Sequence, residues 1–488
     1  MKIKSPQTTP TPATAQNDAP ARTTSSAETP AAKGSWGAPS TSQAKGGWAP
    51  KKTTATAAPA TVAKPAAATA HAPAAVKSQA VSAGASLASA PNLQGLDAVL
   101  DEETHSTARP GNKVTMLFDG VNSFAERDKM IDGAKESICL QTFIFNSDDT
   151  GWALARKLAG KAQEGVQVRV IYDGMGSNRA DPKMFDLMRQ AGVEVREYAD
   201  PLRDPTDLNA RWHEKHLIVD GRASVEGGMN IANEYALGGS EKLVFSRGKQ
   251  GKEAWRDTDA KLEGPAVNDA MQGFLKNWKS VGGQVSDADR AKLLPAIAPR
   301  ADGASVRVVR HHPNDDSKDS NTLKMYQRSI EKAQKSITIE NAYFLPPPEI
   351  RKALIDAAKR GVEVKVMTNS RASNDSGFVS DAARYFYDDL IAAGVKIYEK
   401  QGGTLHAKTA TFDGNLSIVG SVNLNGRSNG RDSEDALLMQ DAGTAKQLEQ
   451  RFATGLRETR PVTADDLKQE SFFTNLKQWA LSTLAWTF

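Results

Sequence analysis

The sequence predicts a duplicated α/β protein, in which two pseudo-symmetric lobes, each a mixed β-sheet flanked by helices, share one site at their interface. Three observations lead to this expectation. A long internal repeat runs through the chain, each copy alternates β-branched runs with helical stretches that end in glycine, and each copy carries the same short polar motif. The 488 residues suffice for two such lobes, and 39% hydrophobic with 25% charged residues is ordinary for a globular protein.

The first element along the chain is a low-complexity segment, residues 1–105, that we expect to be disordered. It is dominated by Ala, Thr, Pro and Ser and has too few large apolar side chains to offset the entropy of ordering. Its first hundred residues carry nine Lys or Arg and three acids, a net charge of +6, whereas the whole chain carries +4. The positive charge therefore belongs to this tail, which is either a solvated spacer or weakly attracted to acidic lipid headgroups.

The repeat defines the two lobes, at residues 110–285 and 303–488, joined by "ADRAKLLPAIAPRADGA". The first lobe reads "AKESICLQTFIF", "LARKLAGKAQEGVQVRVIYDG" and "MRQAGVEVREY". The second reads "AQKSITIENAYF", "IRKALIDAAKRGVEVKVMTN" and "LIAAGVKIYEK" in the same order. Runs such as "VQVRVIY" and "VEVKVMT" predict strands, and the stretches before them predict helices that end at glycine.

Each copy continues into a motif that reads "HEKHLIVDG" in the first lobe and "HAKTATFDG" in the second. Residues two apart on a strand face the same side, so the His and Lys of each motif point into one site. The Asp precedes a Gly between two apolar runs, which indicates a hairpin turn and a scaffold role more than acid–base chemistry. The candidate catalytic set is made of the three polar residues of both motifs: His213, Lys215, Asp220, His406, Lys408 and Asp413.

The strands that follow the motifs end in "GGMN" and "GSVN", which place Asn230 and Asn423 near the same end of each sheet. If the lobes pack about a pseudo-two-fold axis, two His, two Lys and two Asn converge on one pocket. Lys215, Lys408 and the two amides are expected to bind the oxygens of a phosphate and to stabilise its developing charge. One imidazole would attack phosphorus as a neutral nucleophile, and the other would protonate the leaving oxygen.

Neighbouring acids are expected to orient the two imidazoles. The candidates are Asp257 in "WRDTDAKLEG" and Glu434 in "RDSEDALL", with a surface salt bridge as the alternative for each. The scheme requires no metal and no cofactor, and the sequence holds no Cys/His quartet or H-E-x-x-H motif. Three histidines off the repeat are expected to be satisfied or solvated, and the single cysteine to be inert packing: His216, His311, His312 and Cys139.

The motifs resemble the signature of the phospholipase D superfamily, H-x-K-x4-D followed by G-[GS]-x-N, here "HEKHLIVDGRASVEGGMN" and "HAKTATFDGNLSIVGSVN". The resemblance covers residues 112–465, and stretches such as "QTFIFNSDDTG" and "GSVNLNGRS" are most similar to bacterial cardiolipin synthases. It implies a phosphatidyltransferase that acts on phospholipid phosphodiesters through a phosphohistidine, with His213 as the nucleophile and His406 as the acid. It also implies phosphatidylglycerol or a similar lipid as substrate and a membrane surface as partner.

Three other functions stay open at this stage. A phospholipase D hydrolase, including one exported as a toxin or effector, shares the chemistry and differs in how well it excludes water. A nuclease is disfavoured because the chain beyond the tail is slightly acidic, whereas a nucleic acid calls for a basic groove. A catalytically inactive binding module is disfavoured because both motifs are complete. The oligomeric state is left open.

No run of eighteen apolar residues predicts a membrane-spanning helix, and "MKIKSPQTTPTP" lacks the apolar region of a signal peptide. We therefore expect a cytoplasmic enzyme that is peripheral to the membrane, with export outside the Sec route left open. The C-terminal "ESFFTNLKQWALSTLAWTF", residues 470–488, predicts an amphipathic helix. That helix either packs on the second lobe or lies at the lipid interface.

Overall fold

The computed structural model describes residues 95–198, 210–236, 255–313 and 320–469, together with Thr474, Lys477, Gln478, Ala480 and Leu481. Residues 1–94 of the expected tail lie outside this range. So does most of the expected C-terminal helix.

The first lobe is a mixed sheet of seven strands. Their order across the sheet is β1 (Arg109–Phe118), β7 (Thr258–Glu263), β6 (Ala223–Gly227), β5 (His216–Val219), β2 (Ser137–Thr142), β3 (Gln167–Asp173) and β4 (Glu194–Tyr198). The pairs from β1 to β2 are antiparallel, whereas β2, β3 and β4 run parallel and are connected through helices. The repeated "strand, helix, strand" text of the sequence therefore forms the parallel half of this lobe.

The second lobe repeats the same strand order. It runs β8 (Ala304–His311), β14 (Glu434–Gln440), β13 (Leu416–Gly420), β12 (Lys408–Phe412), β9 (Ser336–Asn341), β10 (Glu363–Asn369) and β11 (Lys396–Lys400). One further strand, β15 (Thr459–Val462), pairs antiparallel with β11 at the outer edge. The expectation of two pseudo-symmetric mixed sheets is confirmed.

The two half-sheets are continuous, which the sequence did not indicate. Strand β1 pairs antiparallel with β8, with Arg109 opposite Val306 and Asn112 opposite Ala304 and an irregular register between them. The described strands thus form one sheet of fifteen. The pseudo-two-fold axis passes between β1 and β8, so the equivalent strands β5 and β12 lie four places to either side of it.

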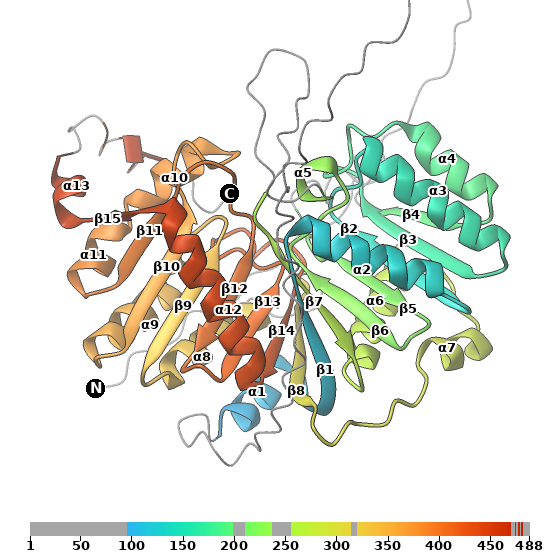
Figure 1. Cartoon of the computed structure of the whole chain (residues 1–488), viewed down its shortest axis with the longest axis horizontal. Coiled ribbons are helices and arrows are strands. Elements are labelled where there is room, and N and C mark those ends of the chain that lie inside the picture. Colours follow the sequence, from blue (N-terminus) through green and yellow to red (C-terminus); the bar gives the residue numbers. More distant parts are fainter. Residues whose placement is uncertain are drawn as a thin grey trace, which may run out of the picture. The chain divides into compact units, whose positions relative to one another are not determined.

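Helices cover both faces of this sheet (Figure 1). The helices of lobe 1 are α2 (Asp119–Gly133), α3 (Asp149–Gln163), α4 (Pro182–Gln190), α5 (Asn233–Ala236), α6 (Val267–Ser280) and α7 (Asp287–Leu293). Those of lobe 2 are α8 (Asn321–Lys332), α9 (Pro348–Lys359), α10 (Gly377–Arg384), α11 (Tyr387–Ala392), α12 (Ala442–Gly455) and α13 (Ala464–Lys468), with a 3₁₀ turn at Leu456–Glu458. Several start at a capping side chain, as where Asp148 accepts from Gly151 N at 3.1 Å.

Apolar side chains hold the two lobes together. Each lobe has its own core between strands and helices, and a third buried cluster runs across both lobes. In that third cluster Phe274 and Trp278 of α6 lie with Val306 of β8 and Leu437 of β14. Since the same cluster includes residues of both lobes, the interface that carries the site is part of the hydrophobic core.

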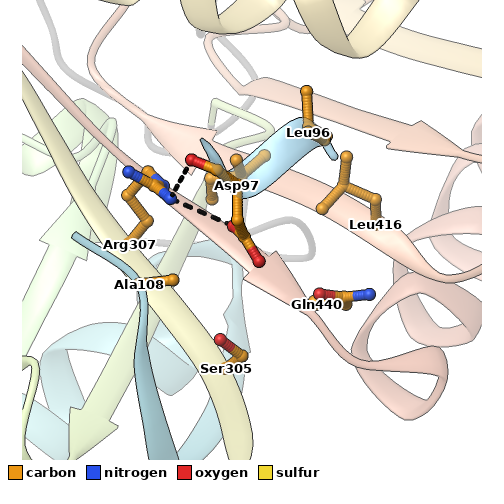
Figure 2. A pocket seen from close by; sticks show the side chains of 8 residues that line it. Leu96, Asp97, Ala108, Ser305, Arg307, Leu416 and Gln440 are labelled. Carbon is orange, nitrogen blue, oxygen red and sulfur yellow. Dashed lines mark hydrogen bonds and ion pairs between the residues drawn. The ribbon is translucent and has the colours of Figure 1, made fainter. Parts of the chain in front are cut away.

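The expected boundary of the disordered tail at residue 105 lies too far along the chain. Residues Leu96–Thr104 form helix α1, and its Leu96 and Leu100 are buried in the core of lobe 2. Figure 2 shows Asp97 of α1 facing Arg307 of β8 beside Leu96 and Leu416. Two leucines one helical turn apart give this short acidic stretch an apolar face, which the surrounding low-complexity composition hides.

Arg307 explains why α1 is held in place. Its side chain is only 1% exposed, and its guanidinium lies 3.0 Å from Asp97 and 2.7 Å from Asp101. Glu103 makes a second link, at 2.7 and 2.8 Å from the guanidinium of Arg328 on α8. Helix α1 thus neutralises a buried cation of lobe 2.

The few described residues of the C-terminal segment contact lobe 2. Lys477 Nζ lies 2.6 Å from Asp381 Oδ2 on α10, and Leu481 packs against the lobe 2 core. Gln478 is buried. These contacts favour packing on the second lobe over the lipid interface. No helix of the described residues is both long and apolar enough to cross a bilayer.

Candidate active site

The two motif histidines lie where each lobe touches the other. His213 precedes β5, and its backbone N–H donates to Ser433 O of lobe 2 at 2.9 Å. His406 precedes β12, and its N–H donates to Arg256 O of lobe 1 at 2.7 Å. Trp212 and Ser433 form an isolated bridge, as do Leu405 and Arg256. Each motif is therefore hydrogen-bonded to a segment of the other lobe, and that segment contains a candidate acid.

The two acids are exchanged between the lobes. Glu434 of lobe 2 has both carboxylate oxygens 3.0 Å from Nδ1 of His213, and Asp257 of lobe 1 has Oδ2 2.7 Å from Nδ1 of His406. All four side chains are buried. Because each Nδ1 is occupied by a carboxylate, Nε2 is the nitrogen that each ring presents to a substrate. Neither lobe alone supplies both the motif histidine and the carboxylate that holds its Nδ1.

The small residue of each "G-[GS]-x-N" motif supports the nearby acid, and sequence reasoning missed this role. Ser421 Oγ donates to Glu434 and accepts from Asp435 N at 3.1 Å. At the equivalent place in lobe 1, a Cβ on Gly228 would lie only 2.2 Å from Asp257 Oδ1. Ser421 thus donates a hydrogen bond to Glu434 in lobe 2, whereas Gly228 leaves space for Asp257 in lobe 1. The difference is visible in the two motif sequences, "GSVN" and "GGMN".

The two lysines complete a buried cationic centre. Lys215 and Lys408 are each 1% exposed, and each Nζ donates to the carbonyl oxygen of the histidine two residues before it. Lys408 Nζ also lies 3.1 and 3.2 Å from the two ring nitrogens of His406. Burial lowers the pKa of Lys215 to about 8 and that of Lys408 to about 7. Because burial makes the charged forms of these lysines less stable, the site is suited to an anionic ligand that stabilises them.

Burial also sets the protonation of the histidine–carboxylate pairs. It is the largest influence that lowers the pKa of His213 and of His406 well below 6.5, and the nearby lysines add to it. Burial raises the pKa of Asp257 to about 6 and that of Glu434 to about 7. Before substrate binds, both imidazoles are therefore neutral at neutral pH. A neutral imidazole has the lone pair that a nucleophile needs.

The rings of the two histidines have different neighbours. Phe143 packs edge-on against His213, with ring centroids 5.2 Å apart. His406 instead lies against Tyr235 and Trp255, at 5.1 and 5.2 Å. None of these aromatic residues lies in the duplicated motif, so the repeat gives no signal for them.

The two asparagines are near the site but differ in their bonding. Asn230 Oδ1 accepts from Ile144 N at 3.0 Å, and its Nδ2 donates to Tyr235 Oη at 2.9 Å, so the protein itself uses both ends of this amide. Asn423 is buried, and its Oδ1 has no hydrogen-bond partner among the described residues. An unpartnered amide oxygen is an acceptor and does not itself bind a phosphate oxygen, so the phosphate-binding role expected for both amides stays a prediction.

The two motif aspartates do not face the imidazoles, so their place in the candidate catalytic set is wrong. Asp220 accepts from the backbone N–H groups of Lys135, Glu136 and Ser137 at 2.8–3.2 Å, at the start of β2. Asp413 does the same at the start of β9, at 2.7–3.2 Å. Both have positive φ, 52° and 54°, within the turns that the D-G pairs predicted. They are scaffold residues.

His216, expected to be satisfied or solvated, is satisfied within a buried charged cluster. Its Nδ1 pairs with Glu226 and lies 3.4 Å from Asp435, and the ligand atoms of these three residues lie within 4.8 Å of one another. Although burial opposes it, Glu226 and Asp435 raise the pKa of His216 well above 6.5, and burial raises the pKa of Asp435 to about 8. The buried imidazole is thus surrounded by carboxylates that stabilise its charged form. Cys139 is buried, as expected of inert packing.

Comparisons with known proteins agree with this architecture. The family described as "Cardiolipin synthase, PLD-like domain" matches residues 128–258 and again residues 326–455. The chain is 31% identical over 376 residues to the major cardiolipin synthase ClsA of Bacillus subtilis, covering 77% of this chain and 75% of that protein. It is 30% identical over 379 residues to a cardiolipin synthase of Clostridium perfringens, covering 76% of each.

A solved structure has the same fold. The phosphatidylserine synthase of Haemophilus influenzae Rd KW20 superposes with a TM-score of 0.62 at 14% identity, covering 80% of this chain and all of that chain. At this identity the likeness concerns the fold alone. The family match falls on two segments of nearly equal length, one in each lobe.

Proposed function

Because the chain belongs to the cardiolipin synthase family with phospholipase D-like domains, we propose that it joins two phosphatidylglycerols, or a related pair of phospholipids, by transferring a phosphatidyl group. It is an enzyme of the phosphatidyltransferase class. One observation supports the mechanism most strongly: the exchange of Asp257 and Glu434 between the lobes, which joins two His–Lys pairs into one centre.

In the first step His213 attacks the phosphorus of the donor lipid. Binding of the anionic phosphodiester beside His406 favours its protonated form, so this ring takes up a proton on Nε2 as the substrate enters. The neutral Nε2 of His213 then forms the N–P bond, the bond from phosphorus to the headgroup oxygen breaks, and that oxygen takes the proton from His406. The headgroup leaves as a free alcohol, which is glycerol when the donor is phosphatidylglycerol. Glu434 stabilises the positive charge that develops on the attacking ring.

The second step reverses these roles. The hydroxyl of the acceptor lipid gives its proton to His406, its oxygen attacks phosphorus, and the N–P bond breaks to return His213 to its neutral form. Asp257 holds the proton-carrying ring through Nδ1 in both steps. The balance is two phosphatidylglycerols converted to one cardiolipin and one glycerol. The free energy changes little, because one phosphodiester replaces another.

The lysines and Asn423 serve the phosphate throughout. Lys215 and Lys408 are buried beside the rings, so their charge acts on the non-bridging oxygens with little screening by water. Asn423 is the further residue that we assign to this group, with its amide Nδ2 as the donor to a phosphate oxygen. No step requires a group that the protein does not carry.

The enzyme is proposed to meet its substrates at a membrane surface, on the cytoplasmic side, without a span of its own among the described residues. The basic tail of residues 1–94 supplies an attraction to acidic lipids. This attraction weakens as salt is added, because the charges involved are exposed.

A product analysis tests the proposal. The purified full chain is incubated with phosphatidylglycerol vesicles, and the lipids are resolved by mass spectrometry. Cardiolipin with an equal amount of glycerol is the expected result. Phosphatidic acid in place of cardiolipin would show that water is the acceptor and that the enzyme is a hydrolase. A lack of any product from phosphatidylglycerol would refute the donor.

A further inference from the structure

A buried carboxylate lies directly behind the catalytic face of the first motif. Glu214 stands between His213 and Lys215 in the segment that leads into β5, and its hydrogen-bond partners differ from those of His213 and Lys215. It is 0% exposed. Its two oxygens are hydrogen-bonded to five side chains: Gln141 at 2.8 Å, Asn277 at 2.6 Å, Ser433 at 2.9 Å, Arg310 at 2.8 and 3.0 Å, and Nε2 of His216 at 3.4 Å.

These donors keep Glu214 ionised inside the protein. Burial alone would raise its pKa, but Arg310 and the surrounding donors hold that pKa well below 4.5. A buried carboxylate that is fully hydrogen-bonded fixes the groups around it in one arrangement.

Ser433 links Glu214 to the active site. Its hydroxyl donates to Glu214, its backbone N–H donates to Arg211 O at 2.7 Å, and its carbonyl accepts from His213 N at 2.9 Å. The next residue is Glu434, whose carboxylate meets Nδ1 of His213. Glu214 therefore follows His213 in the chain and is hydrogen-bonded to Ser433, the residue before Glu434. Ser433 is also the residue whose backbone joins the two lobes at this point.

The second motif uses a different device at the equivalent place. In lobe 2 the place of Glu214 is taken by Ala407, and the bridging residue that corresponds to Ser433 is Arg256. The guanidinium of Arg256 lies 2.6 Å from Glu340 and donates to the carbonyl oxygen of Arg451 at 2.7 Å. A carboxylate thus steadies the interlobe bridge in both halves. It comes from the motif itself in lobe 1 and from β9 in lobe 2.

We propose that Glu214 is a positioning residue of the active site, which holds Ser433 and thereby orients Glu434 against His213. This inference rests on the proposed function, because it assigns Glu434 to the ring that attacks phosphorus. Glu214 does not touch the substrate. It acts through Glu434 alone and leaves the His406–Asp257 pair unaffected.

A double-mutant cycle tests it. Ser433→Ala removes only the hydroxyl that links Glu214 to the bridge, and it is expected to lower kcat by about ten- to one hundred-fold with KM unchanged, because the carboxylate is displaced from the ring. In a Glu434→Gln background the same change is expected to cost less than about two-fold, because there is no longer a carboxylate to orient. In an Asp257→Asn background the full loss is expected again.

Controls separate positioning from folding. Glu214→Gln is the second variant, expected to show the same pattern, and melting temperatures establish that each protein is folded. Thr409→Val, at the place in lobe 2 that matches His216, is expected to leave activity unchanged. Equal losses from Ser433→Ala in the normal and the Glu434→Gln backgrounds would overturn the inference, as would normal activity of both Ser433→Ala and Glu214→Gln. Failure of the proposed function appears separately, as the wrong product from the unaltered enzyme.

Discussion

The two lobes bring the same residue types to the centre, but they surround the two histidines differently. His213 lies against Phe143, and its motif strand carries Glu214 in a buried charged network. His406 lies against Tyr235 and Trp255, and its strand carries Ala407 at the matching place. The repeated strand order explains the matching positions of the His–Lys pairs. In the proposed mechanism, these unequal surroundings distinguish the ring that attacks phosphorus from the ring that carries the proton.

The largest expected effect tests whether both lobes serve one reaction cycle. His213→Ala and His406→Ala are each expected to lower turnover by about a thousand-fold or more, because each removes a group that the other cannot replace. Cardiolipin formation on vesicles measures the loss. The exposed His105, changed to Asn, is the control and is expected to keep full activity. Near-normal activity of either alanine variant would mean that the lobes work independently.

The lysines test whether the shared centre binds its anion through charge. Lys215→Ala and Lys408→Ala are each expected to reduce turnover by about a hundred- to a thousand-fold, since transition-state charge stabilisation is lost. Melting temperatures establish that each variant is folded.

The same lysines give a pH dependence with a definite sign. Their pKa values of about 8 and about 7 lie below the usual 10.5, so both are charged below these values and lose their protons as the pH rises through them. We therefore expect kcat/KM, which reports the free enzyme, to fall between pH 7 and pH 9. Lys408→Arg keeps its charge and is expected to flatten the lower part of this fall. A profile that stays level to pH 9 would contradict the role of burial.

Helix α1 marks a difference between the lobes in stability, because it packs on lobe 2 alone. Deleting residues 1–94 is expected to leave the free energy of unfolding unchanged. Deleting residues 1–105 is expected to lower it by about 2–4 kcal/mol, because Leu96 and Leu100 are lost and Arg307 stays buried without its acids. Urea unfolding measures both. Equal stability of the two truncated proteins would show that α1 contributes nothing.

The smallest expected effect concerns the C-terminal segment, which also has no counterpart in lobe 1. Its described residues contact α10 and the lobe 2 core, so removing residues 470–488 is expected to lower the melting temperature by a few degrees. Activity on vesicles and on a soluble short-chain phospholipid should then fall together. A loss confined to vesicles, at an unchanged melting temperature, would assign the segment to the lipid interface instead.

Much of this arrangement follows from local sequence patterns. The period of two along a strand places the His and Lys of each motif on one face, and the repeat shows that there are two such pairs. The D-G pairs also predicted the turns that remove Asp220 and Asp413 from the chemistry, although the full motif had suggested including them. Patterns of this kind reach only a few residues along the chain.

What the sequence could not predict depends on contacts between distant segments. Asp257 and His406 are 149 residues apart, and nothing local indicates that each acid meets the histidine of the other lobe. The pairing of β1 with β8, which makes one sheet of two, is equally remote. Glu214 occupies the variable position of the H-x-K motif, and most of its partners come from segments far away along the chain. Helix α1 was not predicted because it directly follows a tail rich in Ala, Thr, Pro and Ser and was assigned to that tail.

The proposed mechanism divides the reaction between the two lobes, with His213 attacking phosphorus and His406 moving the proton. A phosphatidyl donor whose leaving group is p-nitrophenol tests this directly, because that group leaves without an acid. His406→Ala is expected to release a rapid burst of about one p-nitrophenol per chain and then stop, with the phosphatidyl group found on His213 by mass spectrometry of the digested protein. His213→Ala is expected to give no burst. A burst from His213→Ala, with the label on His406, would contradict the claim.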